Sequence, residues 1–351
     1  MAAGGTGMTD AGRVLVVGPS WVGDMVMSQV LFIALQQARP GVQIDVLAPA
    51  WSEPLLQRMP QVQRAIELPA GHGELALGRR WRLGRQLRSQ CYYQAIVLPN
   101  SLKSALVPLF AGIPRRTGWR GEMRYGLLND LRILDQTALP LMVQRFAALG
   151  LDAHAALPHE LPQPLLVVDA EAARECAARL GLHPDKPILA LCPGAEFGSA
   201  KRWPVEYYAD LARHYLARGW QVAIYGSAND RPVTAPIRRG SGADPHCRDL
   251  AGRTALAEVV DLLSLSAAVV SNDSGLMHIA AALRRPLLAI YGPTSPSFTP
   301  PLSAAAALLV SDIECAPCFA RECPLGHHRC MRETPVELVV QRLDALLAER
   351  S

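Results

Sequence analysis

The sequence lacks the motifs that identify several common enzyme classes. No G-x-G-x-x-G fingerprint follows the first expected strand of either half, which argues against a nicotinamide dehydrogenase. The G-x-S-x-G elbow of α/β-hydrolases is also missing. Aromatic residues make up only 6% of the chain and no nucleic-acid-binding motif is present, so nucleic acid is not the expected partner.

Long hydrophobic segments are absent as well. Half of the residues are hydrophobic, yet no apolar run approaches the ~18 residues needed to span a bilayer. Residues 1–12 are small and polar, without the apolar segment of a signal peptide, and are predicted to form a disordered tail. We therefore expect a cytoplasmic protein, in which the eight cysteines are reduced thiols unless they bind metal.

Apolar runs alternate with helical patterns along both halves of the 351-residue chain. This alternation predicts parallel βαβ units and an α/β fold of two doubly wound, Rossmann-like domains that face each other across a cleft. We expect these domains at residues 13–157 and 165–351, joined by a proline-bearing linker at 158–164. The expected strands are 14–17, 44–47, 65–68, 95–98, 187–192, 221–225, 267–271 and 286–291. The expected helices are 25–39, 78–89, 103–110, 141–149, 204–218, 256–265, 275–283 and 335–349.

The most informative residue lies in the first turn from strand to helix. Gly18 and Gly23 have the spacing of a phosphate-binding P-loop, but Asp24 stands where that loop needs a lysine. A carboxylate repels phosphate, and α/β folds place their chemistry at the ends of parallel strands. Asp24 is therefore either a cap of the following helix or a catalytic acid or base, and the local sequence leaves both open.

Two loops of the second half carry glycines directly after expected strands. Gly194 and Gly198 let backbone amides approach a ligand closely and Lys201 adds a positive charge, which suits a diphosphate site. A flexible surface loop is the alternative. Gly226 opens the second of these loops, which either floors a nucleotide pocket or only turns the chain.

A third loop, at Asn272–His278, combines a turn with a helix start. Ser274 is placed to cap a helix that begins at Gly275, and His278 lies about one turn further on. Asp273 is placed to accept hydrogen bonds from sugar hydroxyls. The motif fits a structural cap and a phosphate–sugar site equally well. The proline-bearing loop at 291–296 is a candidate wall of the same pocket.

Positive charge is concentrated in residues 79–132. Eleven Lys and Arg residues stand there against two acidic residues, which gives a formal charge of +9 in a chain of +4. A solvated basic face is one interpretation. The other is a surface for an anionic partner such as a phosphorylated lipid or an acidic sugar.

Five longer segments follow one another in a fixed order: Trp21–Met25, Leu98–Ala105, Arg116–Glu122, Cys192–Pro204 and Asn272–His278. They resemble the lipopolysaccharide heptosyltransferase II enzymes of glycosyltransferase family 9, and the resemblance extends from Arg13 to about Ser311. It implies a GT-B fold and an inverting, metal-independent glycosyltransferase that needs no cofactor. The implied donor is ADP-L-glycero-β-D-manno-heptose, and the implied acceptor is the first inner-core heptose of heptosyl-Kdo2-lipid A. It also implies peripheral contact with the cytoplasmic face of the inner membrane.

The resemblance assigns a role to each candidate residue. Asp24 becomes the general base that deprotonates the acceptor hydroxyl, from the half of the molecule opposite the donor. The absence of a D-x-D motif fits a reaction in which protein groups, rather than a divalent metal, neutralise the departing diphosphate. The implied donor-binding residues are Gly194, Ala195, Glu196, Lys201, Gly226, Asp273, Ser274, Gly275 and His278. The implied acceptor-binding residues are Asn100, Lys103, Arg120 and Arg124.

Two features depart from the family pattern. Heptosyltransferase I enzymes have a pair of threonines where this chain has Gly194 and Ala195, so backbone amides would have to replace hydroxyl contacts to the diphosphate. The second departure is a cysteine-rich segment near the C-terminus with two neighbouring histidines. Its spacing suits zinc without matching a standard ribbon or finger, and reduced thiols are the alternative. The candidate ligands are Cys315, Cys318, Cys323 and Cys330.

Two rival functions stay open on the sequence. One is the same fold acting on another acceptor, as in heptosyltransferase I or a later core-sugar transferase. The other is a cysteine-rich metal-binding or interaction protein built on an inactive transferase fold. The intact set of Asp24, Lys201 and Asp273 argues against an inactive enzyme.

Overall fold

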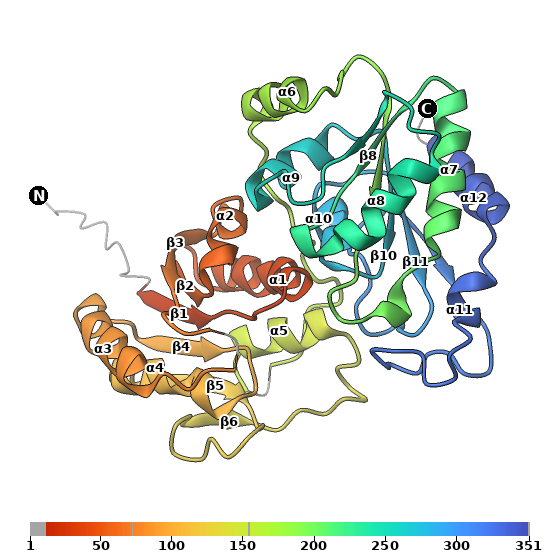
Figure 1. Cartoon of the computed structure of the whole chain (residues 1–351). Helices are drawn as coiled ribbons and strands as arrows, with labels where there is room; N and C mark the ends of the chain where they lie inside the picture. The colour runs from red at the N-terminus through yellow and green to blue at the C-terminus, as the bar shows by residue number, and fades with distance from the viewer. Residues whose placement is uncertain (1–11, 72, 154, 350–351) are drawn as a thin grey trace, which may run out of the picture. The chain divides into compact units, whose positions relative to one another are not determined.

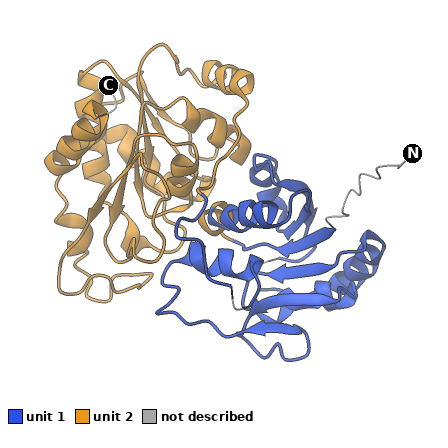
Figure 2. Ribbon diagram, turned by 180° about the vertical axis from the view of Figure 1, so that it is seen from behind, with its two compact units in different colours: residues 1–20, 27–162 blue, residues 21–26, 163–351 orange. Residues whose placement is uncertain are grey.

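The computed structural model describes residues 12–71, 73–153 and 155–349, so the tail predicted at residues 1–12 lies outside the described residues except for Gly12. The chain forms two compact units (Figure 2). Unit 1 comprises Met1–Ser20 and Met27–Pro162, and unit 2 comprises Trp21–Val26 and Gln163–Ser351. Each unit contains one six-stranded sheet, which confirms the predicted α/β class with two doubly wound sheets.

The sheet of unit 1 is entirely parallel, with strand order β3-β2-β1-β4-β5-β6 (Figure 1). Val14–Val17 of β1 are all buried, as expected of a central strand that is covered on both faces. The strands are β1 (Arg13–Val17), β2 (Gln43–Ala48), β3 (Val62–Glu67), β4 (Gln94–Val97), β5 (Arg115–Trp119) and β6 (Asp130–Arg132). The helices are α1 (Val22–Ala38), α2 (Glu53–Leu56), α3 (Leu77–Leu87), α4 (Leu106–Phe110) and α5 (Met142–Gly150).

The sheet of unit 2 is also parallel, with strand order β12-β11-β10-β7-β8-β9. Side chains of α7, α8 and α12 pack against it in one hydrophobic core cluster. The strands are β7 (Ile188–Cys192), β8 (Gln221–Ile224), β9 (Cys247–Asp249), β10 (Ala268–Asn272), β11 (Leu287–Tyr291) and β12 (Ala306–Val310). The helices are α6 (Ala170–Arg179), α7 (Val205–Ala217), α8 (Arg231–Gly240), α9 (Leu256–Ser264), α10 (Gly275–Ala282), α11 (Arg329–Arg332) and α12 (Val336–Ala348).

The two sheets share one topology. In each, the first strand of the unit lies between the second and the fourth, so the strand order reverses at β1/β4 and at β7/β10. Doubly wound sheets bind ligands beyond the carboxyl ends of the strands at this reversal. The loops after β7 and β10, which carry most of the predicted donor-binding residues, therefore flank the expected ligand position of unit 2.

Four strands were not predicted from the sequence: β5, β6, β9 and β12. β5 and β6 contain Arg115, Arg116 and Arg132, and charged residues hide the apolar signature of a strand. β9 has only three residues, and β12 lies at the sheet edge with no fully buried residue.

No helix in the described part of the chain is long and apolar enough to cross a membrane.

Candidate functional site

Asn272, the last residue of β10, fixes the two loops at the strand-order reversal of unit 2. Its Oδ1 accepts hydrogen bonds from Trp203 N at 3.2 Å and from the Tyr208 hydroxyl at 3.0 Å. Its Nδ2 donates to Pro193 O at 2.7 Å. Because Asn272 is fully buried, these bonds hold the loop after β7 against the end of β10.

Lys201 and Asp273 form a buried ion pair in these loops. The distance from Lys201 Nζ to Asp273 Oδ2 is 2.6 Å, and the two side chains are only 13% and 5% exposed. Thr294 Oγ1 donates to the same Asp273 oxygen at 2.6 Å, and Lys201 Nζ lies 4.9 Å from the centre of the Phe197 ring. The sequence indicated Lys201 and Asp273 separately. It gave no signal for their pairing, and it indicated Thr294 only as a member of the candidate pocket wall at 291–296, the loop after β11.

Asp24 lies in the first turn of α1. This turn belongs to unit 2, whereas the sequence predicted Asp24 in the N-terminal domain, opposite the donor-binding residues. Two glycines permit its close packing on the first turn of α10. A Cβ on Gly23 would lie 2.8 Å from His278 Cδ2, and a Cβ on Gly275 would lie 2.7 Å from Val22 Cβ. The N-termini of two helices therefore meet beside Asp24, and each brings a partial positive charge.

Two titratable groups of this site have displaced pKa values. Burial raises the pKa of Asp24 from 3.8 to about 6; the negative charge of Asp273 adds to this effect, and the positive charge of Lys201 opposes it. Burial lowers the pKa of His278 to about 4, so its imidazole is neutral at pH 7. Asp24 is then mostly ionised at neutral pH, with a pKa near the range in which a general base works best.

The structure excludes the capping alternative for Asp24 and places Ser274 at the N-cap position of α10. Asp24 is the third residue of α1, inside the helix, and not its N-cap. Ser274 is the N-cap residue of α10, but its side chain makes no capping hydrogen bond; its Oγ pairs with Ser271 Oγ at 3.2 Å. The first-turn amides of α10 are therefore not satisfied by a serine oxygen, although such amides have no partner within their own helix.

The glycines of the predicted donor loops face other parts of the protein. A Cβ on Gly194 would lie 2.9 Å from Asp230 Oδ1, and a Cβ on Gly226 would lie 2.8 Å from Asp230 Cβ. Similarly, a Cβ on Gly198 would lie 2.1 Å from Arg321 O. Close packing within the protein thus accounts for these three glycines. Of the two residues that follow Gly194, Ala195 is buried and Glu196 is exposed.

Arg124, a predicted acceptor contact, is buried in unit 1 at 1% exposure. Its guanidinium donates to Pro99 O at 2.7 Å, to Asn100 Oδ1 at 3.1 Å and to Trp119 O. Arg124 therefore joins the loops that follow β4 and β5, and the expectation of a direct acceptor contact through this residue is corrected.

The other predicted acceptor residues lie in the same two loops. Asn100 and Arg120 are exposed, and Lys103 is half-buried. Several other arginines of the basic stretch bind backbone carbonyls: Arg80 donates to Leu75 O, Arg116 to Leu127 O and Arg132 to Ala148 O. These arginines keep their charge, but N–H donors of each are bound within unit 1.

The cysteine-rich segment follows β12. Cys315, Cys318, Cys323 and Cys330 are free thiols that line, with His327 and others, a cavity of about 30 Å³. Backbone N–H groups of residues 325–328 lower the pKa of the Cys323 thiol, whereas burial raises that of Cys330. Among residues 12–71, 73–153 and 155–349, no group of three or more His, Cys, Asp or Glu side chains is arranged to hold a metal ion.

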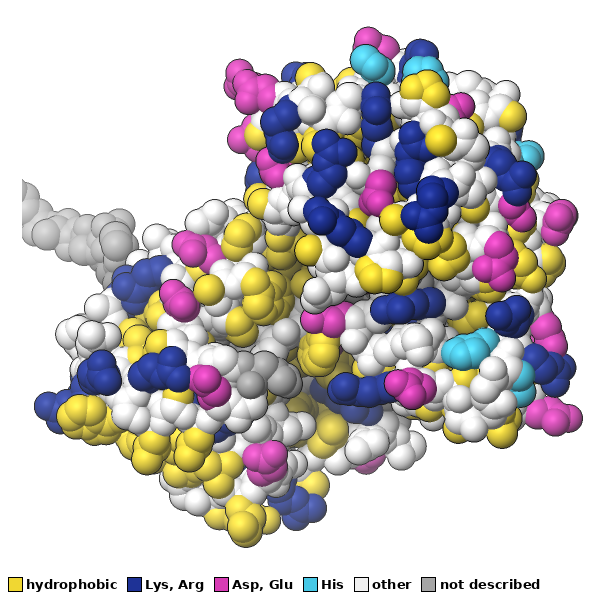
Figure 3. All heavy atoms as spheres, viewed as in Figure 1, with side chains coloured by type: hydrophobic (Ala, Val, Ile, Leu, Met, Phe, Trp, Pro, Cys, Tyr) yellow, Lys and Arg dark blue, Asp and Glu magenta, His cyan; other side chains and the backbone are white. Residues whose placement is uncertain are grey.

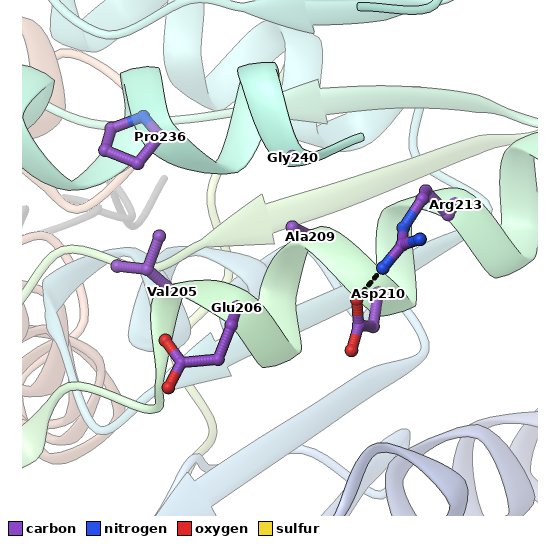
Figure 4. A pocket seen from close by; sticks show the side chains of 7 residues that line it. All are labelled: Val205, Glu206, Ala209, Asp210, Arg213, Pro236 and Gly240. Atoms are coloured by element: carbon purple, nitrogen blue, oxygen red, sulfur yellow. Dashed lines mark hydrogen bonds and ion pairs between the residues drawn. The ribbon is translucent and has the colours of Figure 1, made fainter. Parts of the chain in front are cut away.

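A second cavity, of about 310 Å³, lies between α7 and α8 (Figure 4). Its polar lining consists of Glu206 and an ion pair in which Arg213 points at Asp210. No predicted site residue lines it. The full lining is Val205, Glu206, Ala209, Asp210, Arg213, Pro236 and Gly240.

Comparison with known proteins relates this arrangement to one family. Residues 80–329 match the family model for glycosyltransferase family 9 (heptosyltransferase). The chain is 49% identical to lipopolysaccharide heptosyltransferase 2 of Escherichia coli K12, over 96% of this chain and 99% of that protein. It is 47% identical to lipooligosaccharide heptosyltransferase 2 of Haemophilus influenzae, over 96% of this chain and 100% of that protein. The solved structure of E. coli ADP-heptose LPS heptosyltransferase II matches this chain with a TM-score of 0.88 at 47% identity, over 96% of this chain and 99% of that one. This match confirms the implied GT-B fold.

Proposed function

Because this chain belongs to glycosyltransferase family 9, the heptosyltransferase family, we propose that it transfers L-glycero-D-manno-heptose from ADP-heptose to the first inner-core heptose of heptosyl-Kdo2-lipid A. Near-half identity along almost the whole chain to heptosyltransferase 2 proteins carries this proposal. Since the acceptor is a glycolipid, we place the reaction at the cytoplasmic face of the inner membrane, with peripheral contact between the enzyme and the bilayer.

Asp24 acts as the general base of the proposed reaction. The acceptor hydroxyl attacks the anomeric carbon from the face opposite ADP, the bond from this carbon to the ADP oxygen breaks, and Asp24 takes the hydroxyl proton. The product configuration is therefore inverted. The raised pKa of Asp24 supports this role, because a carboxylate with a pKa of about 6 is a stronger base than an ordinary aspartate and is still ionised at pH 7.

Lys201 and the two helix N-termini stabilise the charge that develops on the departing ADP. An ammonium group has three N–H donors, and Lys201 donates to Asp273 Oδ2 at 2.6 Å and to Asp273 O at 3.4 Å, so it keeps one donor for a phosphate oxygen. The uncapped first turn of α10 and the adjacent first turn of α1 add backbone amides and positive helix ends. These groups take the place of a divalent metal, and Asp273 and Thr294 hold the lysine in position.

The acceptor is bound by the loops after β4 and β5. Asn100, Lys103 and Arg120 are the proposed contacts to its phosphates and Kdo carboxylates. Arg124 holds these two loops together by donating hydrogen bonds to the carbonyls of Pro99 and Trp119.

Release of ADP from ADP-heptose should be measured with two purified acceptors, one ending in Kdo and one ending in the first heptose. We expect turnover only with the heptose-ended acceptor. Turnover with the Kdo-ended acceptor alone would identify a heptosyltransferase I activity. No turnover with either acceptor, in protein with an intact fold, would overturn the proposed function.

The same transfer should persist in EDTA, because Lys201 and the helix N-termini supply the positive potential that Mg²⁺ provides in other transferases. Loss of activity in chelator that Mg²⁺ restores would contradict the metal-free mechanism. Loss that only zinc restores, together with a lower thermal stability, would instead assign a structural metal to the Cys315–Cys330 segment.

Arg120→Glu should raise the KM for the acceptor and leave the KM for ADP-heptose nearly unchanged. Arg120 is exposed, so the substitution puts a negative charge where the acceptor phosphates are proposed to bind. We expect an increase of roughly 10- to 100-fold at low salt, since a charge-assisted contact contributes about 1.5–3 kcal/mol. Kinetics with each substrate varied in turn provide the measurement. Equal changes in both KM values, or none, would remove Arg120 from the acceptor site.

A further inference from the structure

Helix α3 and Leu75, which precedes it, expose three large apolar side chains. Leu75, Leu77 and Trp81 are each 51% exposed. Leu77 and Trp81 are separated by four residues, so they lie on the same side of the helix, and Leu75 precedes them in the chain. Large exposed side chains that cluster in this way mark an interaction site more often than isolated ones do.

The adjacent side of α3 is firmly anchored. Arg80, Gly84 and Leu87 are buried. A Cβ on Gly84 would lie 2.4 Å from Phe110 Cβ, so α3 packs on α4 at the closest approach that its backbone permits. Arg80 donates to Leu75 O at 2.7 Å and to Glu74 O at 3.3 Å, which holds the segment before the helix in place. The exposed apolar residues are therefore presented by a rigid element.

Basic residues accompany this apolar surface. Arg82 and Arg85 are exposed on α3, and the Arg85 guanidinium lies 5.8 Å from the centre of the Trp81 ring. Glu74 is the acidic residue of this segment, and Arg79 neutralises it in an ion pair of 2.5 Å. In Figure 3, hydrophobic side chains gather at the lower left, over the region that Figure 1 labels α3 and α4, with Lys and Arg side chains beside them. We call Leu75, Leu77, Trp81, Arg82 and Arg85 together the α3 face.

We propose that the α3 face docks on the surface of an anionic phospholipid bilayer. Leucine and tryptophan enter the boundary between headgroups and acyl chains, and the arginines meet the lipid phosphates, as in amphipathic helices that lie in a membrane interface. A tryptophan with a guanidinium beside its ring is suited to that depth, because the ring is amphipathic and the cation stays at headgroup level. The inference rests on the proposed function in one respect: a lipid-anchored acceptor gives the enzyme a reason to reach a bilayer.

Binding of the full-length protein to vesicles tests the docking without any substrate. Vesicles of phosphatidylcholine alone and of phosphatidylcholine mixed with phosphatidylglycerol should be sedimented with the protein at low and high salt. We expect binding to the mixed vesicles only, and weaker binding at high salt because exposed charges are then screened. Arg82→Glu/Arg85→Glu should weaken binding about tenfold or more, since each basic residue near an anionic surface contributes substantially. Leu77→Ser/Trp81→Ser should weaken it by a similar factor through the lost apolar contact.

Matched controls come from α12, where Arg342 and Leu338 are also exposed. Arg342→Glu and Leu338→Ser should bind vesicles like the wild type. The proposal would be overturned by no binding of the wild type, by equal binding to neutral vesicles, or by unchanged binding of the two α3 double variants. Unchanged binding of these variants would mean that the docking surface lies elsewhere. Turnover of a delipidated, soluble acceptor should be unaffected in the α3 variants. A wild type that binds vesicles but turns over no acceptor would refute the proposed function and leave the docking intact.

Discussion

We expect Asp24→Asn to lower kcat for heptose transfer by about 10²–10⁴-fold, the usual loss when a general base is removed, while donor affinity changes only a few fold. An amide of the same shape preserves the packing of the α1 turn on α10 but cannot accept the proton. The measurement is steady-state kinetics together with calorimetric titration of ADP. Near-normal kcat in a folded variant would end the assignment of Asp24 as the base.

The pH dependence of the wild type provides the matching test. The base must be ionised, and burial raises its pKa to about 6, so kcat/KM should be on a plateau above this pH and fall about tenfold per unit below it. The residual activity of the Asp24→Asn variant should lack this acid limb. An acid limb that persists in the variant belongs to another group.

Asp24→Asn should also stabilise the protein at neutral pH. A carboxyl group whose pKa is raised on folding contributes stability below its unfolded value of 3.8, and this contribution is lost as pH rises through about 6. The ionised carboxylate therefore costs roughly 2–3 kcal/mol at pH 7 relative to a neutral side chain. A negative charge in a first helical turn normally gains about 0.3–1 kcal/mol, so burial prevails. Urea unfolding at pH 7 and at pH 4 should show the variant more stable only at pH 7. A variant less stable at pH 7 would show that the attraction of the carboxylate to the helix N-terminus outweighs burial.

The sequence predicted the loops to which we assign the chemistry, because each follows a short apolar strand with glycine or small polar residues. Asp273, Lys201 and Asp24 were all singled out in this way. Their mutual arrangement could not be predicted. The Lys201–Asp273 pair joins residues that are 72 positions apart, and the α1 turn joins unit 2 through contacts of Gly23 with His278 and of Gly275 with Val22. Such contacts depend on the packing of whole elements, which local spacing does not encode.

The partners of two polar side chains also differ from those predicted from the sequence, for a related reason. Ser274 has the identity of a helix cap, yet its hydroxyl turns to Ser271. Arg124 has the charge of a phosphate ligand, yet backbone carbonyls of two loops take up its donors. A guanidinium has five N–H groups and binds a carbonyl as readily as a phosphate, so formal charge predicts the presence of donors and not their partners. The same reasoning explains why only part of the +9 stretch is available at the surface.

The buried Lys201–Asp273 pair leads to the prediction with the largest expected effect on stability. Lys201→Met should destabilise the protein by about 3–5 kcal/mol, because it leaves the Asp273 carboxylate buried without its counter-charge. It should also weaken ADP binding roughly 10- to 100-fold, since a charge-assisted contact contributes about 1.5–3 kcal/mol. The pH of the acid limb should rise, since the charge of Lys201 lowers the pKa of Asp24. The measurements are urea unfolding, calorimetric ADP titration and a pH–rate profile.

The double variant Lys201→Met/Asp273→Asn separates structure from function. With both charges removed, stability should return to within about 1–2 kcal/mol of the wild type, because a neutral amide can be buried at far lower cost than a lone carboxylate. ADP binding should stay weakened, because the Lys201 donor to the phosphate is still missing. The exposed pair Arg218–Asp344, at 2.8 Å with side chains 44% and 38% exposed, is the matched control. Its equivalent double variant should change stability by no more than about 1 kcal/mol and leave ADP binding intact. If Lys201→Met/Asp273→Asn binds ADP like the wild type, the diphosphate does not bind Lys201. If Lys201→Met alone is as stable as the wild type, the buried carboxylate has another partner and our account of the ion pair is wrong.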